Sequence, residues 1–390
     1  CWNKIETKFG YNYLNSKKLS HTDVCIIGAG IVGLTSAYFL SRAGLTVTVI
    51  EKDSIGSHAS GFAYGTLSPL GEAGLLDDIM PELDLAKLGM ETHTQFAKDL
   101  PEETGIDIQH RFRPAMDLAF SETEAAICKA QAEWRNSQNG YKAEWVDGVE
   151  ARKLIPSLSE DIVGAGITEG VADVDPYRLM LALTQACEKN GVQIRHGIFS
   201  DLKEGPEASV SINTSFGKVK CEKAVIAMGP WSHEIEKWLG YKVPVEPLKG
   251  QILRLNSPNI ELKFSVGWEG NYACTKLDGL IWAGTTEENA GFDERTTYEG
   301  RNQVMSSLLK MIPQLDESEL VQQTACLRPL SKDGKVILGQ LNDYKNVHIA
   351  TGAGRKGILL GPAMGHIISD LVTKGKTNLN LDNFSLSRFN

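Results

Sequence analysis

The sequence predicts an α/β and α+β protein in which a Rossmann-type domain is joined to a second domain built on an antiparallel sheet. Three observations predict this fold class. A glycine-rich turn at 28–33 lies between an apolar strand pattern and a helix pattern. Between about 240 and 325, short strand patterns follow one another almost without helical crossovers. The length of 390 residues also exceeds what one hydrophobic core usually organises.

The first element is a βαβ unit near the start of the chain. Residues 23–27 form a short apolar run, which is typical of a buried parallel strand. A helical pattern over 31–43 ends at Gly44, and β-branched residues then alternate over 46–50 up to Glu51. Strand, helix and strand follow one another as the Rossmann-type arrangement requires.

Beyond this unit the chain alternates between two layers. Residues 86–150 are rich in charge and helix formers, which indicates an excursion out of the Rossmann-type layer. The segments expected to return to that layer are a helix at 177–190, strands at 192–194, 224–227, 336–339 and 347–350, and a helix at 362–373. The segments expected in the antiparallel layer are strands at 251–255, 272–275 and 280–284 and a helix at 301–311.

These patterns divide the chain into two discontinuous domains with short ends. The limits we expect are 20–88, 150–238 and 326–376 for the Rossmann-type domain, 89–149 and 239–325 for the second domain, 1–19 for an N-terminal extension and 377–390 for a C-terminal tail.

Composition excludes several classes of protein. A net charge of −9 argues against a nucleic-acid partner, because phosphate binding needs clustered Lys and Arg. Seven scattered cysteines, never spaced as C-x-x-C, predict neither a disulfide framework nor a metal site. No apolar run is long enough to cross a bilayer. We expect a cytoplasmic protein; peripheral membrane association and a homo-oligomer stay open. The leading Cys1 suits a processed lipoprotein and a fragment equally.

The turn at 28–33 matches the dinucleotide fingerprint G-x-G-x-x-G. Gly28 permits the tight turn, Gly30 lets the backbone approach a pyrophosphate, and Gly33 lets helix and strand pack closely. Ile31 and Val32 begin the helix, whose N–H groups and positive dipole end suit phosphates. The fingerprint alone does not separate FAD from NAD.

Glu51 completes the fingerprint. It lies 51 − 33 = 18 residues after the last glycine, at the end of the second strand, where a carboxylate can bind ribose hydroxyls. The same carboxylate would repel a 2′-phosphate, so NADP is disfavoured.

A second glycine-rich junction between a strand and a helix, at 352–357, favours FAD. We expect the following helix to begin at Pro362, because proline suits the first helical position. The positive end of its dipole could face the flavin and stabilise negative charge on the reduced ring. An ordinary capped helix is the alternative.

Taken in order, the motifs resemble the D-amino acid oxidase superfamily, and most closely its glycine oxidase branch. The resemblance runs from about Asp23 to Leu371. Besides the fingerprint and Glu51, the segments that carry it are 59–61, 65–69, 174–176, 227–232, 247–251, 284–288, 291–293, 327–334 and 354–362.

The resemblance implies a bound FAD, held covalently or non-covalently, with a substrate domain covering the catalytic face of the flavin. It also implies further cofactor contacts. These are Lys52, Ala59, Ser60, Thr66, Leu67, Val174, Ala227, Gly229, Trp231, Gly354, Arg355, Lys356, Gly357, Ile358 and Leu359.

Three residues are implied at the substrate. Arg328, in the L-R-P segment, would hold a substrate carboxylate by bidentate pairing, although a surface salt bridge is the alternative. Tyr272 would close the pocket and hydrogen-bond the carboxylate, or is a core tyrosine instead. Arg355 matches the arginine of the R-N-G-I-L-L segment, but Lys356 replaces the usual Asn, which leaves the role of Arg355 in doubt.

Cys326 occupies the position at which the monomeric sarcosine oxidase branch carries its flavin-linking cysteine. Glycine oxidases have a small residue there. A covalent flavin link and a buried free thiol both stay open.

The function implied is FAD-dependent oxidation of a small amino acid or amine of the glycine, sarcosine or D-amino acid type. Hydride transfer to flavin N5 would give an imine, then an oxo acid and ammonia, with oxygen or a quinone-type carrier as acceptor. One alternative is a 2-hydroxy acid dehydrogenase, which would want a base, often His, near the flavin. Another is a flavin-binding subunit of a multichain dehydrogenase.

Overall fold

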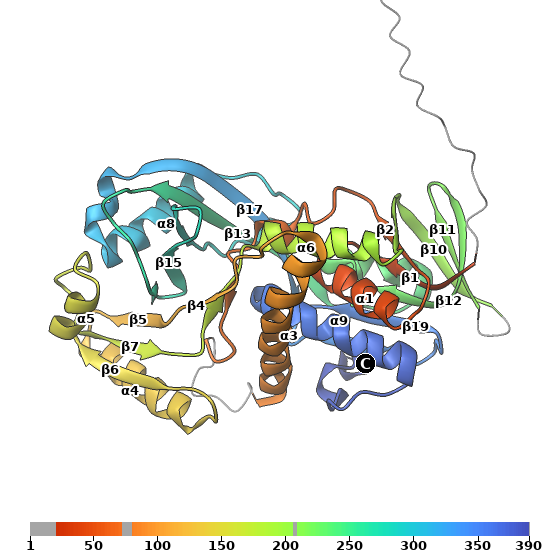
Figure 1. The fold of residues 1–390 in the computed structure, drawn as a ribbon, viewed down its shortest axis with the longest axis horizontal. Helices are drawn as coiled ribbons and strands as arrows, with labels where there is room; N and C mark the ends of the chain where they lie inside the picture. Colours follow the sequence, from red (N-terminus) through yellow and green to blue (C-terminus); the bar gives the residue numbers. More distant parts are fainter. Residues whose placement is uncertain (1–20, 72–79, 206–208, 390) are drawn as a thin grey trace, which may run out of the picture.

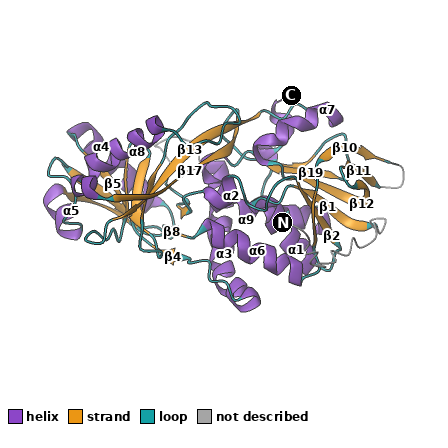
Figure 2. Ribbon diagram, turned by 90° about the horizontal axis from the view of Figure 1, so that it is seen from above, coloured by secondary structure: helices purple, strands orange, loops and turns teal. Residues whose placement is uncertain are grey.

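The computed structural model describes residues 21–71, 80–205 and 209–389. The expected N-terminal extension and Cys1 lie outside the described residues. Figures 1 and 2 show an elongated molecule with a large sheet at each end and helices α3, α6 and α9 between them. The two sheets confirm the expected mixed fold class.

The first sheet contains the predicted βαβ unit. Its central strand β1 (Thr22–Ile27) pairs in parallel with β2 (Val47–Glu51) on one side and β12 (Gly217–Ile226) on the other. The strand order is β10-β11-β12-β1-β2-β9, and β19 also pairs with β12. The other strands of this sheet are β9 (Gln193–His196), β10 (Phe199–Glu204), β11 (Val210–Thr214), β18 (Ile337–Gln340) and β19 (Val347–Thr351).

Four helices form one core with this sheet: α1 (Ile31–Arg42), α3 (Met80–Thr104), α6 (Pro176–Lys189) and α9 (Gly357–Lys374). Helices α1 and α9 pack closely because two glycines of α9 face α1. A Cβ on Gly365 would lie 2.7 Å from the Ser36 nitrogen, and one on Gly361 would lie 2.6 Å from Ile31 Cγ2. This contact brings the N-termini of both helices to one place.

Helix α9 corrects one expectation, because it begins at Gly357 and not at Pro362. A proline inside a helix leaves the carbonyl four residues earlier without its N–H donor. Here that carbonyl belongs to Ile358, and it accepts a hydrogen bond of 2.8 Å from Nε2 of the buried His93 on α3. The missing donor is thereby replaced, and the helix continues through the proline.

The second sheet has the order β17-β13-β16-β15-β14-β5-β7-β6. It is antiparallel as expected, except that β14 and β5 pair in parallel. Its strands are β5 (Ala115–Ala119), β6 (Ala143–Asp147), β7 (Gly164–Thr168), β13 (Val245–Asn256), β14 (Ser265–Trp268), β15 (Asn271–Thr275), β16 (Ile281–Gly284) and β17 (Glu319–Ser331).

Smaller elements complete the described chain. Three short strands form a third sheet, β3 (Thr66–Leu67), β8 (Ala172–Asp173) and β4 (Arg111–Phe112). The other α-helices are α2 (Ala59–Phe62), α4 (Glu122–Ser137), α5 (Gly148–Leu154), α7 (Glu236–Leu239) and α8 (Tyr298–Met311). The 3-10 helices are η2 (Gly229–Ile235), η3 (Pro313–Glu317), η4 (Gly354–Lys356), η5 (Asp382–Phe384) and η6 (Leu386–Phe389).

The domain limits expected from the sequence do not follow the observed elements and cores. The limit between 88 and 89 falls inside α3, whose Phe96 and Leu100 belong to the first core. The limit at 150 would place β7 with the Rossmann-type domain, although β7 pairs with β5 and β6 of the second sheet. We therefore propose limits that follow the cores, with α3 in the first domain and β7 in the second.

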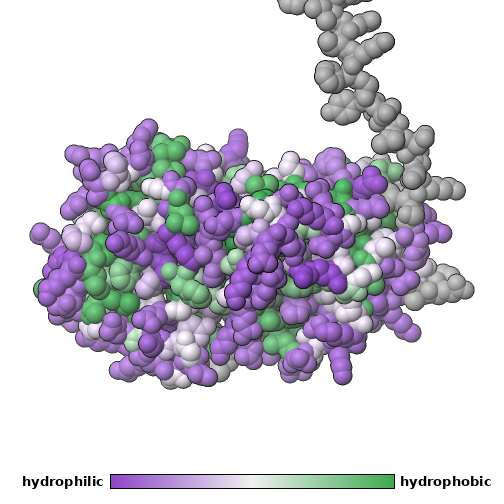
Figure 3. Space-filling model, viewed as in Figure 1, coloured by the Kyte–Doolittle hydropathy of each residue, from purple (hydrophilic) through white to green (hydrophobic). Residues whose placement is uncertain are grey.

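Among the described residues, no helix is both long and apolar enough to cross a bilayer. On the face drawn in Figure 3, hydrophobic side chains are scattered among more numerous hydrophilic ones.

Candidate cofactor and substrate site

A cavity opens where β1 and β2 end and α1 begins, with an empty volume of about 1340 Å³ that includes space open to solvent. Most of the predicted cofactor residues line it: Gly28, Gly30, Ile31, Val32, Glu51, Lys52, Ala59, Ser60, Ala227, Gly229, Trp231, Gly354, Arg355, Gly357 and Ile358. Three others, Thr66, Lys356 and Leu359, line a neighbouring cavity, whereas Gly33, Leu67 and Val174 line neither.

The geometry of the glycine turn explains the first and last fingerprint glycines. Gly28 has a φ of +105°, and a Cβ there would lie 2.3 Å from the Ala227 carbonyl oxygen. A Cβ on Gly33 would lie 1.9 Å from the Gly28 oxygen, so this glycine permits the close packing of helix on strand. Gly33 therefore shapes the turn from outside the cavity.

Two helix N-termini face the cavity, and at that of α1 the Ile31 N–H donates a hydrogen bond of 3.0 Å to Ser60 Oγ. Gly30, which has no side chain, precedes α1, and Lys356, whose side chain makes no capping hydrogen bond, precedes α9. At the end of β2, Glu51 Oε2 accepts a hydrogen bond of 2.7 Å from the Ala29 N–H, which fixes the carboxylate beside the turn. Two positive dipole ends and one fixed carboxylate suit the pyrophosphate and ribose of a dinucleotide. The residues present therefore fit FAD.

Side chains from both domains meet at the edge of this cavity. The Lys52 ammonium lies 3.6 Å from the Trp231 ring centre, and Trp231 stacks on Phe292 at 5.5 Å. His58 lies between Asp53 and Glu294, with each ring nitrogen 2.9 Å from a carboxylate oxygen. The segment around Phe292 is thereby fastened to the cofactor domain.

Sequence reasoning missed several residues that line the first cavity. They are Ser54, Gly56, Ser57, His58, Ala63, Gly197, Ile198, Phe199, Met228, Pro230, Glu234, Pro329, Ala350, Thr351 and Ala353. One signal could have found three of them. Gly197 and its two successors directly follow β9, a parallel neighbour of β2, and ligands bind at the carboxyl ends of such strands.

A second cavity, with an empty volume of about 2160 Å³ that includes space open to solvent, meets the first one at Arg328 and Arg355, which line both. Tyr272 also lines the second cavity, and its ring lies 4.4 Å from that of Tyr64 in an edge-on arrangement. All three predicted substrate residues are therefore at the junction or in the adjoining wall.

The Arg328 guanidinium is held by a hydroxyl and a carbonyl. It donates to Thr285 Oγ1 at 2.7 Å and to the Thr286 carbonyl oxygen at 3.3 Å. It lies against Gly250, where a Cβ would be 2.2 Å from Nη1. Among the described residues, no carboxylate pairs with Arg328. Its charge is therefore available to an anionic ligand.

Arg355 differs from Arg328 in having a carboxylate partner. Its Nε and Nη2 both donate to the Glu287 carboxylate. This hydrogen bonding holds the pKa of Glu287 below its usual range. Next to it, Lys356 Nζ lies 3.5 Å from Glu82 Oε2. The lysine that departs from the family pattern is thus also paired.

Cys326 is buried, lines the first cavity and lies two residues before Arg328. Its burial raises the pKa of the thiol, and the reactive form of a cysteine is the thiolate. We therefore expect acid precipitation of the holoprotein to release all of the flavin. Absorbance at about 450 nm would be measured in the supernatant and in the pellet. A yellow pellet that turns colourless in a Cys326→Ala variant would establish a covalent link instead.

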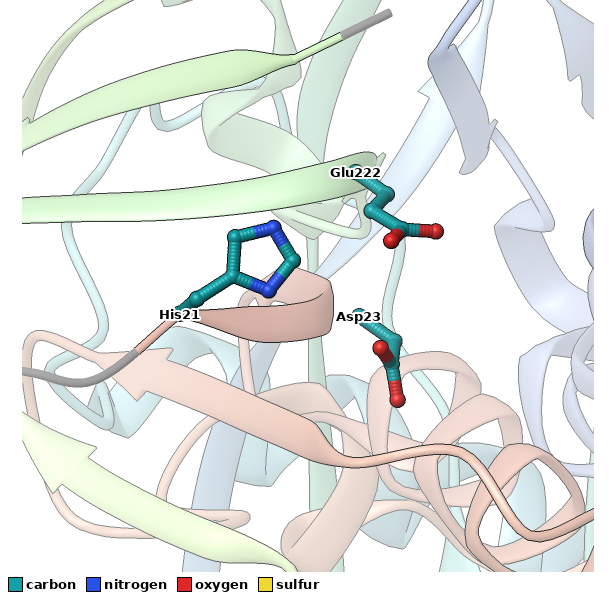
Figure 4. A group of neighbouring side chains, drawn as sticks. All are labelled: His21, Asp23 and Glu222. Carbon is teal, nitrogen blue, oxygen red and sulfur yellow. The ribbon is translucent and has the colours of Figure 1, made fainter.

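The six described cysteines are free and buried. Three other side chains that could together hold a cation, His21, Asp23 and Glu222, lie near the start of β1 (Figure 4), at the opposite end of this strand from Gly28. The Asp23 carboxylate already accepts hydrogen bonds from the Thr46 N–H and hydroxyl, at 2.7 and 2.8 Å. Nothing in these contacts demands a metal ion.

Comparisons with known proteins agree with this geometry. The family described as FAD dependent oxidoreductase (DAO) matches residues 23–371. A glycine oxidase from Geobacillus kaustophilus is 29% identical over 370 residues, which cover 94% of this chain and 97% of the relative.

Two solved structures are also similar. The crystal structure of glycine oxidase from Geobacillus kaustophilus matches with a TM-score of 0.89 at 28% identity, covering 94% of this chain and 99% of that one. The iminodiacetate oxidase from Chelativorans sp. BNC1 matches with a TM-score of 0.85 at 25% identity, covering 93% and 98%.

Proposed function

The chain belongs to the DAO family of FAD-dependent oxidoreductases, and from this premise we propose that it oxidises a small amino acid or amine at the carbon that bears the nitrogen. Its cofactor is FAD. The substrates we propose are of the glycine, sarcosine or D-amino acid type, because the similar proteins are glycine oxidases and an iminodiacetate oxidase.

The observation that carries the proposal is Arg328 at the junction of the two cavities. A guanidinium without a carboxylate partner, in contact with both cavities, can bind a substrate carboxylate through two parallel hydrogen bonds. That contact would leave the α-carbon and amine directed towards the cofactor cavity. FAD, when bound, supplies the two-electron acceptor.

The remaining residues orient the substrate and exclude water. Tyr272, in the wall of the second cavity, offers a hydroxyl that can hydrogen-bond the carboxylate and a ring that covers it. The N-terminus of α9, which has no side-chain cap, places positive charge beside the first cavity, where it would favour negative charge on the reduced ring of bound FAD. Tyr272 would thus position the substrate, and the helix N-terminus would act through its charge.

The two alternative functions are not favoured. A 2-hydroxy acid dehydrogenase would want a base such as His near the flavin. Among the described residues no histidine lines the second cavity, and His58, which lines the first, is held between the carboxylates of Asp53 and Glu294. A purely flavin-binding subunit would not need Arg328 and Tyr272 beside an open cavity. We propose oxygen as the electron acceptor, after the oxidases among the relatives. Location and oligomeric state stay predictions.

Anaerobic mixing of the holoprotein with candidate substrates tests the proposal. We expect glycine, sarcosine or a small D-amino acid to bleach the flavin absorbance, and admission of oxygen to restore it with formation of hydrogen peroxide. Bleaching by 2-hydroxy acids alone would establish the dehydrogenase alternative. If no compound in the panel bleached a fully FAD-loaded protein, catalysis of this kind would be excluded.

A further inference from the structure

We propose that Glu287 restricts the site to substrates with a single carboxylate, because it occupies Arg355 and leaves Arg328 as the one carboxylate-binding arginine. This inference rests on the proposed function. It names the substrate class as monocarboxylate amino acids, and it assigns the exclusion of dicarboxylates to one residue of this chain.

The charged side chains that line the second cavity leave one position at which a carboxylate of the substrate can bind. Four cations line this cavity, and three of them have a carboxylate partner. Arg135 pairs with Asp117 at 2.8 Å, Lys356 Nζ lies 3.5 Å from Glu82, and Arg355 pairs with Glu287. Only Arg328, among the described residues lining the cavity, remains to bind a carboxylate from outside.

Glu287 is held in place by the segment that contains it. Residues 285–288 alternate in direction: the side chains of Thr285 and Glu287 reach the two arginines, whereas those of Thr286 and Glu288 join a hydrogen-bond network with Gln251 of β13. The alternation means that one short segment sets the position of both guanidinium groups.

This hydrogen-bond network fixes the segment to β13. Lys249 and Glu288 exchange two backbone hydrogen bonds of 3.0 Å, and Lys249 Nζ lies 3.5 Å from Glu288 Oε2. Gln251, which is fully buried, donates from Nε2 to Glu288 Oε1 at 2.7 Å and from its backbone N–H to Thr286 Oγ1 at 3.0 Å. Glu287 therefore projects from a rigid support, and a ligand cannot push the whole segment aside cheaply.

A second substrate carboxylate would meet Glu287 at Arg355. To bind there it would have to displace a bidentate, charge-assisted pair, and the displaced Glu287 would remain nearby as a like charge. The glutamine side chain has nearly the same shape as glutamate but no charge. Glu287→Gln should therefore remove the negative charge that pairs with Arg355 without opening the wall of the cavity.

Sarcosine and iminodiacetate form the matched pair of substrates, because both are N-substituted glycines. Iminodiacetate carries a second carboxylate on the N-substituent, where sarcosine has only hydrogen. Either one would lose two electrons and two protons to give an imine, which water then hydrolyses. Their ratio of kcat/KM thus reports recognition of the second carboxylate.

The test compares this ratio in the FAD-loaded wild type, Glu287→Gln and the control Glu269→Gln. Glu269 lines the same cavity and is exposed at the turn between β14 and β15. We expect the iminodiacetate to sarcosine ratio to rise by about tenfold or more in Glu287→Gln. It should stay at the wild-type value in Glu269→Gln, and the gain should vanish in the double variant Glu287→Gln/Arg355→Gln.

Ligand binding gives a readout that needs no turnover. Malonate and acetate, titrated into the holoprotein and followed by the flavin spectrum, differ by one carboxylate, and Glu287→Gln should tighten malonate selectively. An unchanged ratio and unchanged malonate affinity in a fully FAD-loaded Glu287→Gln would overturn the inference, as would an equal gain in Glu269→Gln. A wild type that is inactive on all amines would contradict the proposed function instead.

Discussion

Replacement of Arg328 by glutamine is expected to lower kcat/KM for the amino acid substrate by roughly 10²- to 10³-fold while FAD stays bound. The removal of one partner from a desolvated, hydrogen-bonded charge pair costs about 2–5 kcal/mol, and each 1.36 kcal/mol is a factor of about ten in rate. Arg328 would form such a pair with the substrate carboxylate, because bound substrate covers it and excludes water. Its other hydrogen bonds go to Thr285 and Thr286 and not to a carboxylate.

Most of that loss should appear in KM. The carboxylate is bound equally in the ground state and in the transition state, so its loss weakens uniform binding. A smaller fall in kcat should accompany it, because a misplaced substrate holds its α-carbon further from the reactive geometry.

Two further variants make the Arg328 prediction specific. Arg328→Lys keeps the charge but lacks the planar fork, and should recover only part of the loss. Arg295, which is exposed and pairs with Asp293, serves as the control, and Arg295→Gln should behave as the wild type. Steady-state kinetics with flavin content normalised by absorbance would measure all three. An Arg328→Gln enzyme with wild-type KM would remove Arg328 from the substrate site.

The parts that could be predicted from the sequence are those whose physics is local. The turn at Gly28, the start of α1 at Ile31 and the position of Glu51 all follow from residues within one βαβ unit. The same holds for α6 and α8, whose predicted limits differ from the observed ones by a few residues. Short-range steric and capping rules decide these features.

The features that could not be predicted from the sequence depend on contacts between segments that are far apart in the chain. Local rules predict a helix start at Pro362, but His93, 265 residues before Ile358, supplies the donor that lets α9 begin earlier. The pairing of Arg355 with Glu287 joins residues 68 apart, and no spacing rule points to it. Burial and pairing of charged groups are properties of the folded chain, and the sequence pattern alone does not contain them.

Acidification from pH 6.5 to pH 5 is expected to destabilise the folded protein through two buried histidines. Burial lowers the pKa of His93 and of His348 to about 4 each. Above pH 6.5 both imidazoles are neutral in the folded and unfolded states. Below pH 6.5 each of these histidines becomes protonated in the unfolded state, whereas in the folded state it stays neutral until about pH 4. The free energy of unfolding therefore falls as the pH falls.

The magnitude follows from the width of that window. Each histidine contributes about 1.36 kcal/mol per pH unit in which only the unfolded form is protonated, or about 2 kcal/mol between pH 6.5 and pH 5. The paired carboxylates with lowered pKa, such as Glu287, lose their contribution mainly below this range, near the ordinary pKa of a carboxyl. The decline between pH 6.5 and pH 5 therefore belongs largely to the histidines.

Two substitutions of His93 separate its titration from its hydrogen bond. The contact with the Ile358 carbonyl requires the proton on Nε2, and a glutamine amide can donate from a similar position. His93→Gln should keep the stability near neutral pH and reduce the acid-induced loss by about 2 kcal/mol. His93→Phe should show the same reduced pH dependence, but lower stability by about 1–3 kcal/mol at every pH, because the buried carbonyl loses its donor.

Urea unfolding of the holoprotein, at constant excess FAD and at several pH values between 7.5 and 5, would measure both effects. The two variants should give parallel curves of unfolding free energy against pH, with that of His93→Phe lying lower. If His93→Gln retained the full wild-type pH dependence, the proton uptake on unfolding would have to occur elsewhere, and the neutral buried His93 that supports α9 beside the cofactor cavity would be disproved.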